Sequence, residues 1–400
     1  MKKSNISLLC RSNYVVGIAN DPFQLTCDSG TVTSRPVAIE TIKEYGPIVA
    51  NHVNTFNTDK LAFVHVATLW GLTVDQTYLI LCDSETEGGW HKKFRITPEL
   101  TPDLDPLKRR LYTALNSRST VMDLECILRP DFTDCALVQG NEPFMATTPV
   151  DCGNLESFQP FAGSLLYHGL FFLPAKYPFG WLLHLPNPED RYLVDFAALR
   201  AKEATCQKRP DWRRSKKVRK NIASGQCRLV VQDTPEALRQ ALERAEAYQI
   251  DMHHSTWLCP EGISILSSLA PSGVAEKSKK SVQVLVIDLV DANDNVLAGC
   301  CGFTLGSVYH DFTMYTQRRD RNGYGTFLTK LIAEALYTCG YDMWYWGLRV
   351  DYMAQYENGY GACTLPRSEF YRRWVQHRDI PLSEDIVTFV RSNKAMVPSA

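Results

Sequence analysis

The chain has 400 residues, of which 45% are apolar and 22% charged, and its formal net charge is −1. This length predicts two or three domains, each large enough to bury a hydrophobic core of its own. The near-zero charge excludes a general attraction to nucleic acids or to anionic membranes. A polyanionic partner would therefore have to bind a local basic patch.

The 13 cysteines are scattered along the chain and include no CxxC pair. A small disulfide-stapled fold is excluded, and reduced thiols in a cytoplasmic protein are expected. The same spacing predicts no metal site. Arg11 and Asn13 interrupt the apolar N-terminal segment, which argues against a secretory signal. No run of eighteen apolar residues occurs, so we expect no membrane partner.

Residues 1–150 predict an N-terminal mixed α/β domain, to which the sequence assigns no role. The apolar runs at 61–70 and 77–82 are typical of strands, and the segments 47–56 and 105–117 are typical of short helices.

Residues 151–226 form the second predicted region, which begins at a loop-like stretch and carries a basic patch. Eight of the thirteen residues from 208 to 220 are Lys or Arg. Ser215 is placed to cap a helix that continues through Val218 and Ile222. The patch fits phosphate groups, with Trp212 available for stacking, although a merely solvated helix face has the same composition.

Residues 227–400 form the third predicted region. A strand at 227–233 and a helix at 234–250 precede a strand at 282–290, an Asp/Asn-rich turn, and a run at 296–316 long enough for one or two strands. A glycine-containing basic loop, a helix ending at Gly340 and a strand at 342–348 follow. This order predicts an α/β (α+β) fold with a GCN5-related N-acetyltransferase-like mixed sheet flanked by helices.

Six motifs between residues 165 and 374 carry a family resemblance. They are GLFFLP with WLLHLPNPEDR, the basic helix, STWL, LAGCCGFTLGSVYHDFTMYT, NGYGTFL and GACTLPRSEF. In this order they resemble the leucyl/phenylalanyl-tRNA–protein transferases. The resemblance implies transfer of Leu or Phe from charged tRNA to an acceptor protein that begins with Arg or Lys, which marks that protein for degradation. Aminoacyl-tRNA is the implied co-substrate, and no cofactor is implied.

The resemblance also implies site residues. Trp257 corresponds to the tryptophan near the terminal adenosine of the tRNA. The implied amino-acid pocket contains Cys300, Tyr309, Met314 and Tyr315, and the implied tRNA phosphate contacts are Arg213, Arg214, Lys216, Lys217, Arg219 and Lys220. Ordinary core packing is the alternative for the large apolar members of this set.

The acidic residue of the family falls on Phe312, one place after Asp311. In a regular strand this shift would turn the side chain to the other face, unless a bulge re-aims it. Asp311 is therefore the candidate catalytic residue. The aspartate and glutamine of a second family motif fall on Tyr345 and Gly347, so both groups are missing here.

Two other functions fit the same residues. Residues 320–325, DRNGYG, resemble half of the pyrophosphate-binding loop of enzymes that use acetyl-coenzyme A. A relative that binds tRNA or peptide without catalysing transfer would retain the basic patch and dispense with the missing acid and amide. The fold alone does not choose among these three functions.

Overall fold

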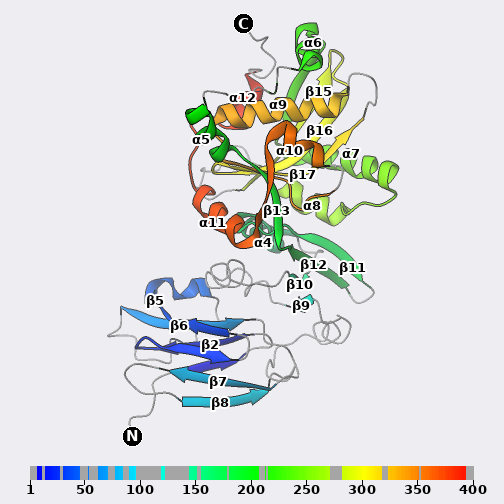
Figure 1. Cartoon of the computed structure of the whole chain (residues 1–400). Helices are drawn as coiled ribbons and strands as arrows, with labels where there is room; N and C mark the ends of the chain where they lie inside the picture. Colours follow the sequence, from blue (N-terminus) through cyan, green and yellow to red (C-terminus); the bar gives the residue numbers. More distant parts are fainter. Residues whose placement is uncertain are drawn as a thin grey trace. The chain divides into compact units, whose positions relative to one another are not determined.

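The computed structural model describes residues 7–10, 14–27, 30–45, 53, 62–70, 77–83, 90–95, 119–121, 144–150, 155–177, 180–206, 212, 215–270, 282–317, 323–350 and 353–392. The chain forms two compact units (Figure 1). The first comprises Met1–Val150 and Ala175–Asn187, and the second comprises Asp151–Pro174 and Pro188–Ala400. The predicted helix at 105–117, all of 47–56 except Val53, and both Arg213 and Arg214 lie outside the described residues.

The first twelve strands form three four-stranded sheets, with the orders β1-β2-β6-β5, β4-β3-β7-β8 and β11-β12-β10-β9. Strands β6 and β7 fall on the two runs predicted from their apolar residues. The bounds are β1 Ser7–Cys10, β2 Tyr14–Ala19, β3 Gln24–Cys27, β4 Gly30–Thr33, β5 Arg35–Ala38, 3-10 helix η1 Ile39–Tyr45, β6 Phe63–Trp70, β7 Thr77–Asp83, β8 Trp90–Arg95, β9 Ser119–Val121, β10 Phe144–Val150, β11 Leu173–Tyr177 and β12 Gly180–Asn187.

The second unit is built on a seven-stranded sheet with the order β14-β15-β16-β17-β18-β13-β19. All neighbouring strands are antiparallel except β17 and β18, which are parallel and joined through α9. The bounds are α4 Leu155–Tyr167, β13 Asp190–Asp195, α5 Phe196–Cys206, α6 Lys216–Ser224, β14 Cys227–Gln232, α7 Pro235–His253, α8 Pro260–Ser268, β15 Gln283–Asp291, β16 Val296–Leu305, β17 Val308–Thr316, α9 Tyr324–Cys339, β18 Met343–Tyr345, α10 Ala354–Tyr360, β19 Ala362–Pro366, α11 Arg367–His377 and α12 Ile386–Arg391. The predicted mixed sheet flanked by helices is confirmed.

Local sequence signals account for several of these elements. Ser215 Oγ accepts a hydrogen bond from the Val218 amide at 3.2 Å and caps α6 as predicted, while Thr234 caps α7 ahead of Pro235. The turn between β15 and β16 is closed by the Asp291 carboxylate, which accepts hydrogen bonds from backbone amides in that turn.

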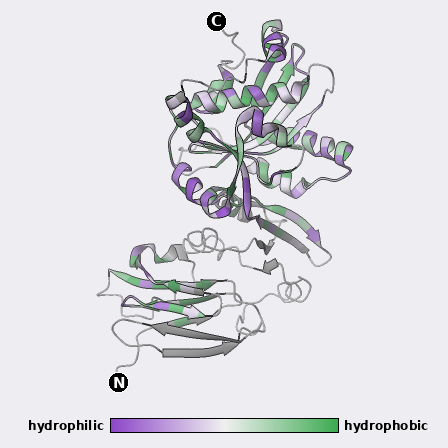
Figure 2. Ribbon diagram, in the orientation of Figure 1, coloured by the Kyte–Doolittle hydropathy of each residue, from purple (hydrophilic) through white to green (hydrophobic). Residues whose placement is uncertain are grey.

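The two faces of this sheet are covered by different helices. Because side chains alternate along a strand, the consecutive residues Ile287 and Asp288 point to opposite faces. Ile287 packs in the core beneath α9, and Asp288 forms an ion pair with Arg244 of α7 at 2.9 Å. Figure 1 shows α9 running across the sheet, and Figure 2 shows apolar residues concentrated in the strands, with polar residues on the outer helices.

The predicted strand at 342–348 is much shorter in the structure. β18 contains only Met343–Tyr345, and Gly347 has the left-handed backbone angle φ = 82°. After its last pair with β17 the chain stays hydrogen-bonded to β13, since the Trp346 amide donates to the Tyr192 carbonyl at 2.9 Å and the Gly347 carbonyl accepts from the Tyr192 amide at 2.8 Å. No helix in the described residues is long and apolar enough to cross a membrane.

Candidate active site between strands β17 and β18

A cavity of about 860 Å³ lies where β17 and β18 separate. The last parallel pair joins His310 to Tyr345. The next residue on each strand, Asp311 on one arm and Trp346 on the other, lines the cavity. Loss of strand pairing therefore creates the opening, and the two diverging arms form its walls.

A β-bulge in β17 changes which side chains face the cavity. Cys301 pairs with Thr313 and Gly302 pairs with Asp311, so Phe312 has no partner of its own. Such a bulge shifts the alternation of side chains by one position. The bulge that would turn the Asp311 side chain to the face expected for an acid at position 312 is therefore present.

The bulge lets β17 line the cavity from both faces of the sheet. Before it, Tyr309 and Asp311 face α9, and after it Met314 does so, with its sulfur 3.8 Å from Thr329 Oγ1. On the other face Thr313 accepts a hydrogen bond from Gln249 of α7 at 2.8 Å. The cavity is therefore bordered by α9 on one side of the sheet and by α7 on the other.

Asp311 contributes the one carboxyl group among the described residues that line the cavity. Its exposed fraction is 6%, and burial raises its pKa to about 7, an effect that a hydrogen bond from Cys300 opposes. A carboxyl group with this pKa exchanges a proton readily near neutral pH, as a general base requires.

The N-terminus of α9 forms another part of the wall. Gly323 is its N-cap, with φ = 61° and no side-chain cap, and Gly325 and Thr326 line the cavity. The amides of a first helical turn have no intrahelical partners, so they favour an anion. A Cβ atom at Gly325 would lie 2.8 Å from Thr316 Oγ1, so glycine is needed for the helix to approach β17 this closely.

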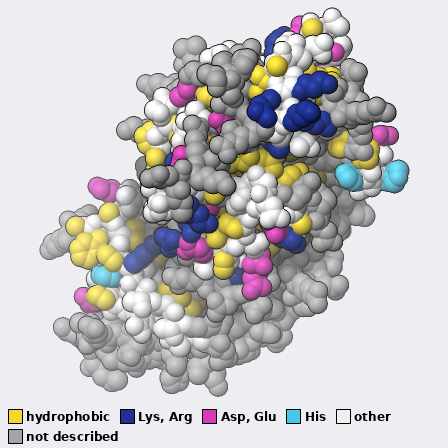
Figure 3. All heavy atoms as spheres, turned by 45° about the horizontal axis from the view of Figure 1, so that its top comes forward, with side chains coloured by type: hydrophobic (Ala, Val, Ile, Leu, Met, Phe, Trp, Pro, Cys, Tyr) yellow, Lys and Arg dark blue, Asp and Glu magenta, His cyan; other side chains and the backbone are white. Residues whose placement is uncertain are grey.

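Helix α6 places basic side chains beside this helix terminus. Val218 and Ile222 are buried and anchor the helix. A Cβ atom at Gly323 would lie 2.6 Å from Lys217 Nζ, so this ammonium group reaches the start of α9. The exposed basic residues of α6 are Lys216, Lys217, Arg219 and Lys220. Figure 3 shows Lys and Arg side chains gathered on the face of the molecule that carries α6.

The wall on the α7 side carries polar and aromatic groups. Gln249 connects two threonines, since it donates to Thr313 and accepts from Thr256 at 2.5 Å. The Trp257 ring lies edge-on to Phe312, with 6.0 Å between ring centroids. His253 and Tyr248 complete this side.

The structure brings together some of the predicted site residues. Trp257, Asp311 and Met314 line the cavity. Cys300 and Tyr309 are fully buried beneath α9, and Tyr315 points to the opposite face, where its hydroxyl donates to Asp288 at 2.5 Å. The four basic residues of α6 lie on the side of the cavity where α9 begins.

Other residues of the cavity were not found from the sequence. Trp346 was assigned to a strand, although it lies beyond the strand end. Met353 and Tyr356, three residues apart on the α10 side, face the cavity together, and this spacing was the available signal. Trp212, expected to be available for stacking, is buried at 5% exposure against Phe196 and Tyr337.

Comparisons with known proteins give only distant similarities. No family model matches the chain, and no curated protein matches it. The C-terminal domain of a protein described as a lysylphosphatidylglycerol synthetase from Agrobacterium fabrum aligns over 76% of this chain and 74% of that one, with 12% identity and a TM-score of 0.30. L-PGS from Bacillus licheniformis aligns over 63% of this chain and 76% of that one, with 9% identity and a TM-score of 0.32.

The expected membership of the leucyl/phenylalanyl-tRNA–protein transferases is wrong. No family model supports it, and the solved structures that align carry a different name. The motifs behind it consist mainly of glycines and aromatic residues, which pack strands and helices in many folds. An acceptor protein with an N-terminal Arg or Lys is not supported by these comparisons either.

Proposed function

We propose that the second unit is an aminoacyltransferase, which takes an aminoacyl group from charged tRNA and passes it to an amine or hydroxyl acceptor. The observation that carries this proposal is a cavity with the buried Asp311 carboxyl group in its wall and an uncapped helix terminus at its border. The cavity is large enough for a small acyl group together with the end of its carrier.

The tRNA phosphates would lie along α6 and the start of α9. Four exposed cationic side chains on α6 are next to the first turn of α9, whose N-cap is not bonded by a side chain, and both features attract phosphate. The net charge of the chain is −1, so this attraction is local. This local attraction would direct the 3′ end of the tRNA, which bears the amino acid, into the cavity beside Gly325 and Thr326.

The acceptor would approach from the α7 side, past Gln249 and Trp257. Its nitrogen or oxygen attacks the ester carbonyl carbon, and a new bond forms to that carbon. The bond between the carbonyl carbon and the ribose oxygen then breaks. Asp311 accepts the proton that the acceptor loses and returns it to the departing ribose oxygen, so the carboxylate is regenerated. Alignment of the two substrates supplies much of the remaining acceleration, since the ester is already activated.

A transfer assay tests this proposal. The full chain is incubated with tRNA charged with labelled amino acids and with an extract of small molecules and lipids as the source of acceptor. We expect label to leave the tRNA and to appear in a product, and Asp311→Asn to reduce the rate at least about 100-fold. Loss of label at the same rate with the unsubstituted protein, with Asp311→Asn protein and without any protein would refute the proposal.

Binding of charged tRNA gives a second test that needs no acceptor. Neutralising Lys216, Lys217, Arg219 and Lys220 together is expected to weaken binding about tenfold or more and to flatten its dependence on salt. The control replaces Lys202 and Arg239, two exposed cations on α5 and α7, by alanine. Equal losses in both proteins would show that α6 is not the binding surface.

The uncapped start of α9 also favours a second candidate, an enzyme that uses an acyl-coenzyme A donor. The same amides would bind a pyrophosphate group. Acetyl-coenzyme A would then raise the melting temperature of the protein, whereas charged tRNA would leave it unchanged. The opposite pattern supports the tRNA donor.

A further inference from the structure

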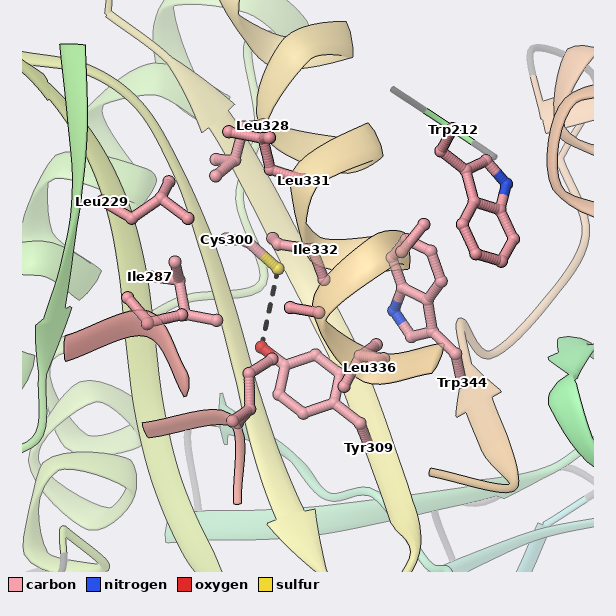
Figure 4. Packing of buried hydrophobic residues seen from close by; sticks show 14 of the residues in the cluster. Trp212, Leu229, Ile287, Cys300, Tyr309, Leu328, Leu331, Ile332, Leu336 and Trp344 are labelled. Atoms are coloured by element: carbon pink, nitrogen blue, oxygen red, sulfur yellow. Dashed lines mark hydrogen bonds between the residues drawn. The ribbon is translucent and has the colours of Figure 1, made fainter. Parts of the chain in front are cut away.

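Cys300 and Tyr309 face each other in the core beneath α9. They lie on the neighbouring strands β16 and β17, and the exposed fraction of each is 0%. The distance from Cys300 Sγ to Tyr309 Oη is 3.7 Å, within hydrogen-bonding range for sulfur. Figure 4 shows both groups pointing toward each other among the apolar side chains of α9 and the sheet.

The Asp311 carboxyl group joins the same hydrogen-bonded chain. Tyr309 and Asp311 are two residues apart and precede the bulge, so they share a face of β17. The Cys300 thiol hydrogen-bonds the Tyr309 hydroxyl, and its interaction with the Asp311 carboxyl group raises the pKa of the thiol and lowers that of the carboxyl group. Burial raises the pKa of this thiol well above its ordinary value, so it keeps its proton. The thiol therefore donates to the carboxylate and accepts from the Tyr309 hydroxyl.

The local backbone is shaped to admit this arrangement. Gly302 is the strand partner of Asp311. A Cβ atom at Gly302 would lie 2.7 Å from Tyr309 Oη and 2.5 Å from the carbonyl oxygen of His310. Any residue larger than glycine would push the tyrosine hydroxyl away from the sulfur.

We propose that Cys300 is a positioning residue, whose thiol holds the Asp311 carboxyl group in the orientation that presents it to the cavity. This inference deepens the proposed function, since it concerns the group that would accept the proton of the acceptor. Tyr309 in turn orients the thiol. Its hydroxyl donates a hydrogen bond to the sulfur, so the S–H group points toward Asp311. The polar chain thus runs from the sheet interior to the cavity wall.

Ordinary core packing makes a different prediction from positioning. A buried cysteine that only fills space can be replaced by serine or alanine with a loss of stability, and neither change acts on a nearby carboxyl group in a particular direction. A positioning thiol must affect Asp311 in opposite directions in the two variants. A hydroxyl donates a stronger hydrogen bond than a thiol, and a methyl group donates none.

Other titratable groups also face Asp311 and must be considered in any titration. Cys300 and Tyr309 share its face of the sheet, and Tyr248 and His253 of α7 and Tyr356 of α10 line the same cavity, whereas Cys301 of β16 lies on the opposite face.

Titration of the Asp311 carboxyl group tests the inference without any substrate. The full chain is labelled with ¹³C at aspartate carboxyl carbons, and the Asp311 signal is assigned by its absence from Asp311→Asn protein. Relative to the unsubstituted protein, we expect Cys300→Ser to lower the Asp311 pKa and Cys300→Ala to raise it, each by about half a unit to one unit. The matched control is Cys301→Ala, on the same strand and equally buried but on the opposite face, which should leave the Asp311 pKa unchanged.

Shifts of the Asp311 pKa in opposite directions in the two variants support the inference. A failure to transfer an aminoacyl group from charged tRNA would refute the proposed function and leave this result unchanged. Equal Asp311 pKa values in all proteins, or shifts in the same direction for serine and alanine, would overturn it. If Cys300→Ala fails to fold, Cys300→Ser alone decides, because only positioning predicts a lower Asp311 pKa in that variant.

Discussion

His310 and Tyr345 are the last paired residues of β17 and β18, and the centroids of their rings are 4.4 Å apart. Burial lowers the pKa of His310 to about 3, an effect to which the positive charge of Arg191 adds, so the imidazole is neutral at physiological pH. The neutral imidazole therefore packs against the Tyr345 ring directly before the point where the two strands separate. Beyond this pair, the cavity wall begins with Asp311 and Trp346.

Asp311→Asn should stabilise the fold at pH 8 while it abolishes transfer. The folded-state pKa of about 7 exceeds the ordinary value of 3.8, so ionisation of Asp311 costs stability. That cost is complete above pH 7 and disappears as the pH falls toward 4. We expect a gain on the order of 1–3 kcal/mol at pH 8, measured by urea unfolding, which vanishes near pH 4. Transfer by the unsubstituted protein should rise with pH through about 7.

Gly302→Ala should destabilise the second unit. The added Cβ would meet the carbonyl oxygen of His310 at 2.5 Å and Tyr309 Oη at 2.7 Å, and the carbonyl belongs to backbone that is fixed in the sheet. We expect a loss of about 1–3 kcal/mol in the free energy of unfolding. The control is Gly359→Ala in α10, where the new atom meets nothing within 4 Å and helix propensity should leave stability equal or slightly higher.

His254→Gly should stabilise the end of α7. His254 is the C-cap of that helix, with φ = 56°, a left-handed conformation that disfavours side chains. We expect thermal or urea unfolding to show a gain of up to about 1 kcal/mol, and a loss for His254→Val, whose branched side chain tolerates this backbone poorly. His253→Gly, one residue earlier and within the helix, should instead be destabilising by about 1 kcal/mol. A lower free energy of unfolding in His254→Gly would contradict the conclusion that the His254 backbone is strained.

Asp342→Asn should remove part of the acid sensitivity of the fold. Burial raises the Asp342 pKa, but hydrogen bonds from His377 and Ser307 and the charge of Arg200 outweigh it, so the pKa is lowered overall. This stabilisation is present above pH 4 and is lost as the pH falls through the folded-state pKa. The variant should lose about 1–3 kcal/mol at pH 7 and show a flatter stability profile below pH 4. An unchanged profile would exclude this carboxylate as a source of acid lability.

Sequence patterns were sufficient for the parts of the fold with strong local signals. Thr234 and Pro235 predict the start of α7, and the apolar spacing before Gly340 predicts α9, because caps and periodicity act within a few residues. The antiparallel strands and the basic helix α6 were predictable for the same reason.

The cavity depended on features that local patterns do not carry. The position of the bulge at Phe312 is set by pairing with β16, so the sequence could state the need for a bulge but not its presence. Trp346 follows two aromatic residues and has the composition of a strand, yet pairing with β17 stops one residue earlier. Trp212 lies within a basic run, and its burial follows from aromatic partners far away in the chain, such as Tyr337.

Because α9 and α7 border the cavity from opposite faces of one sheet, the proposed function places donor and acceptor on opposite sides of the cavity at the same time. Under that proposal a ternary complex would precede the reaction, and the amino acid would pass directly between its two carriers without being bonded to the protein. Initial-velocity plots with both substrates varied should accordingly intersect, whereas parallel lines would indicate an acylated protein intermediate.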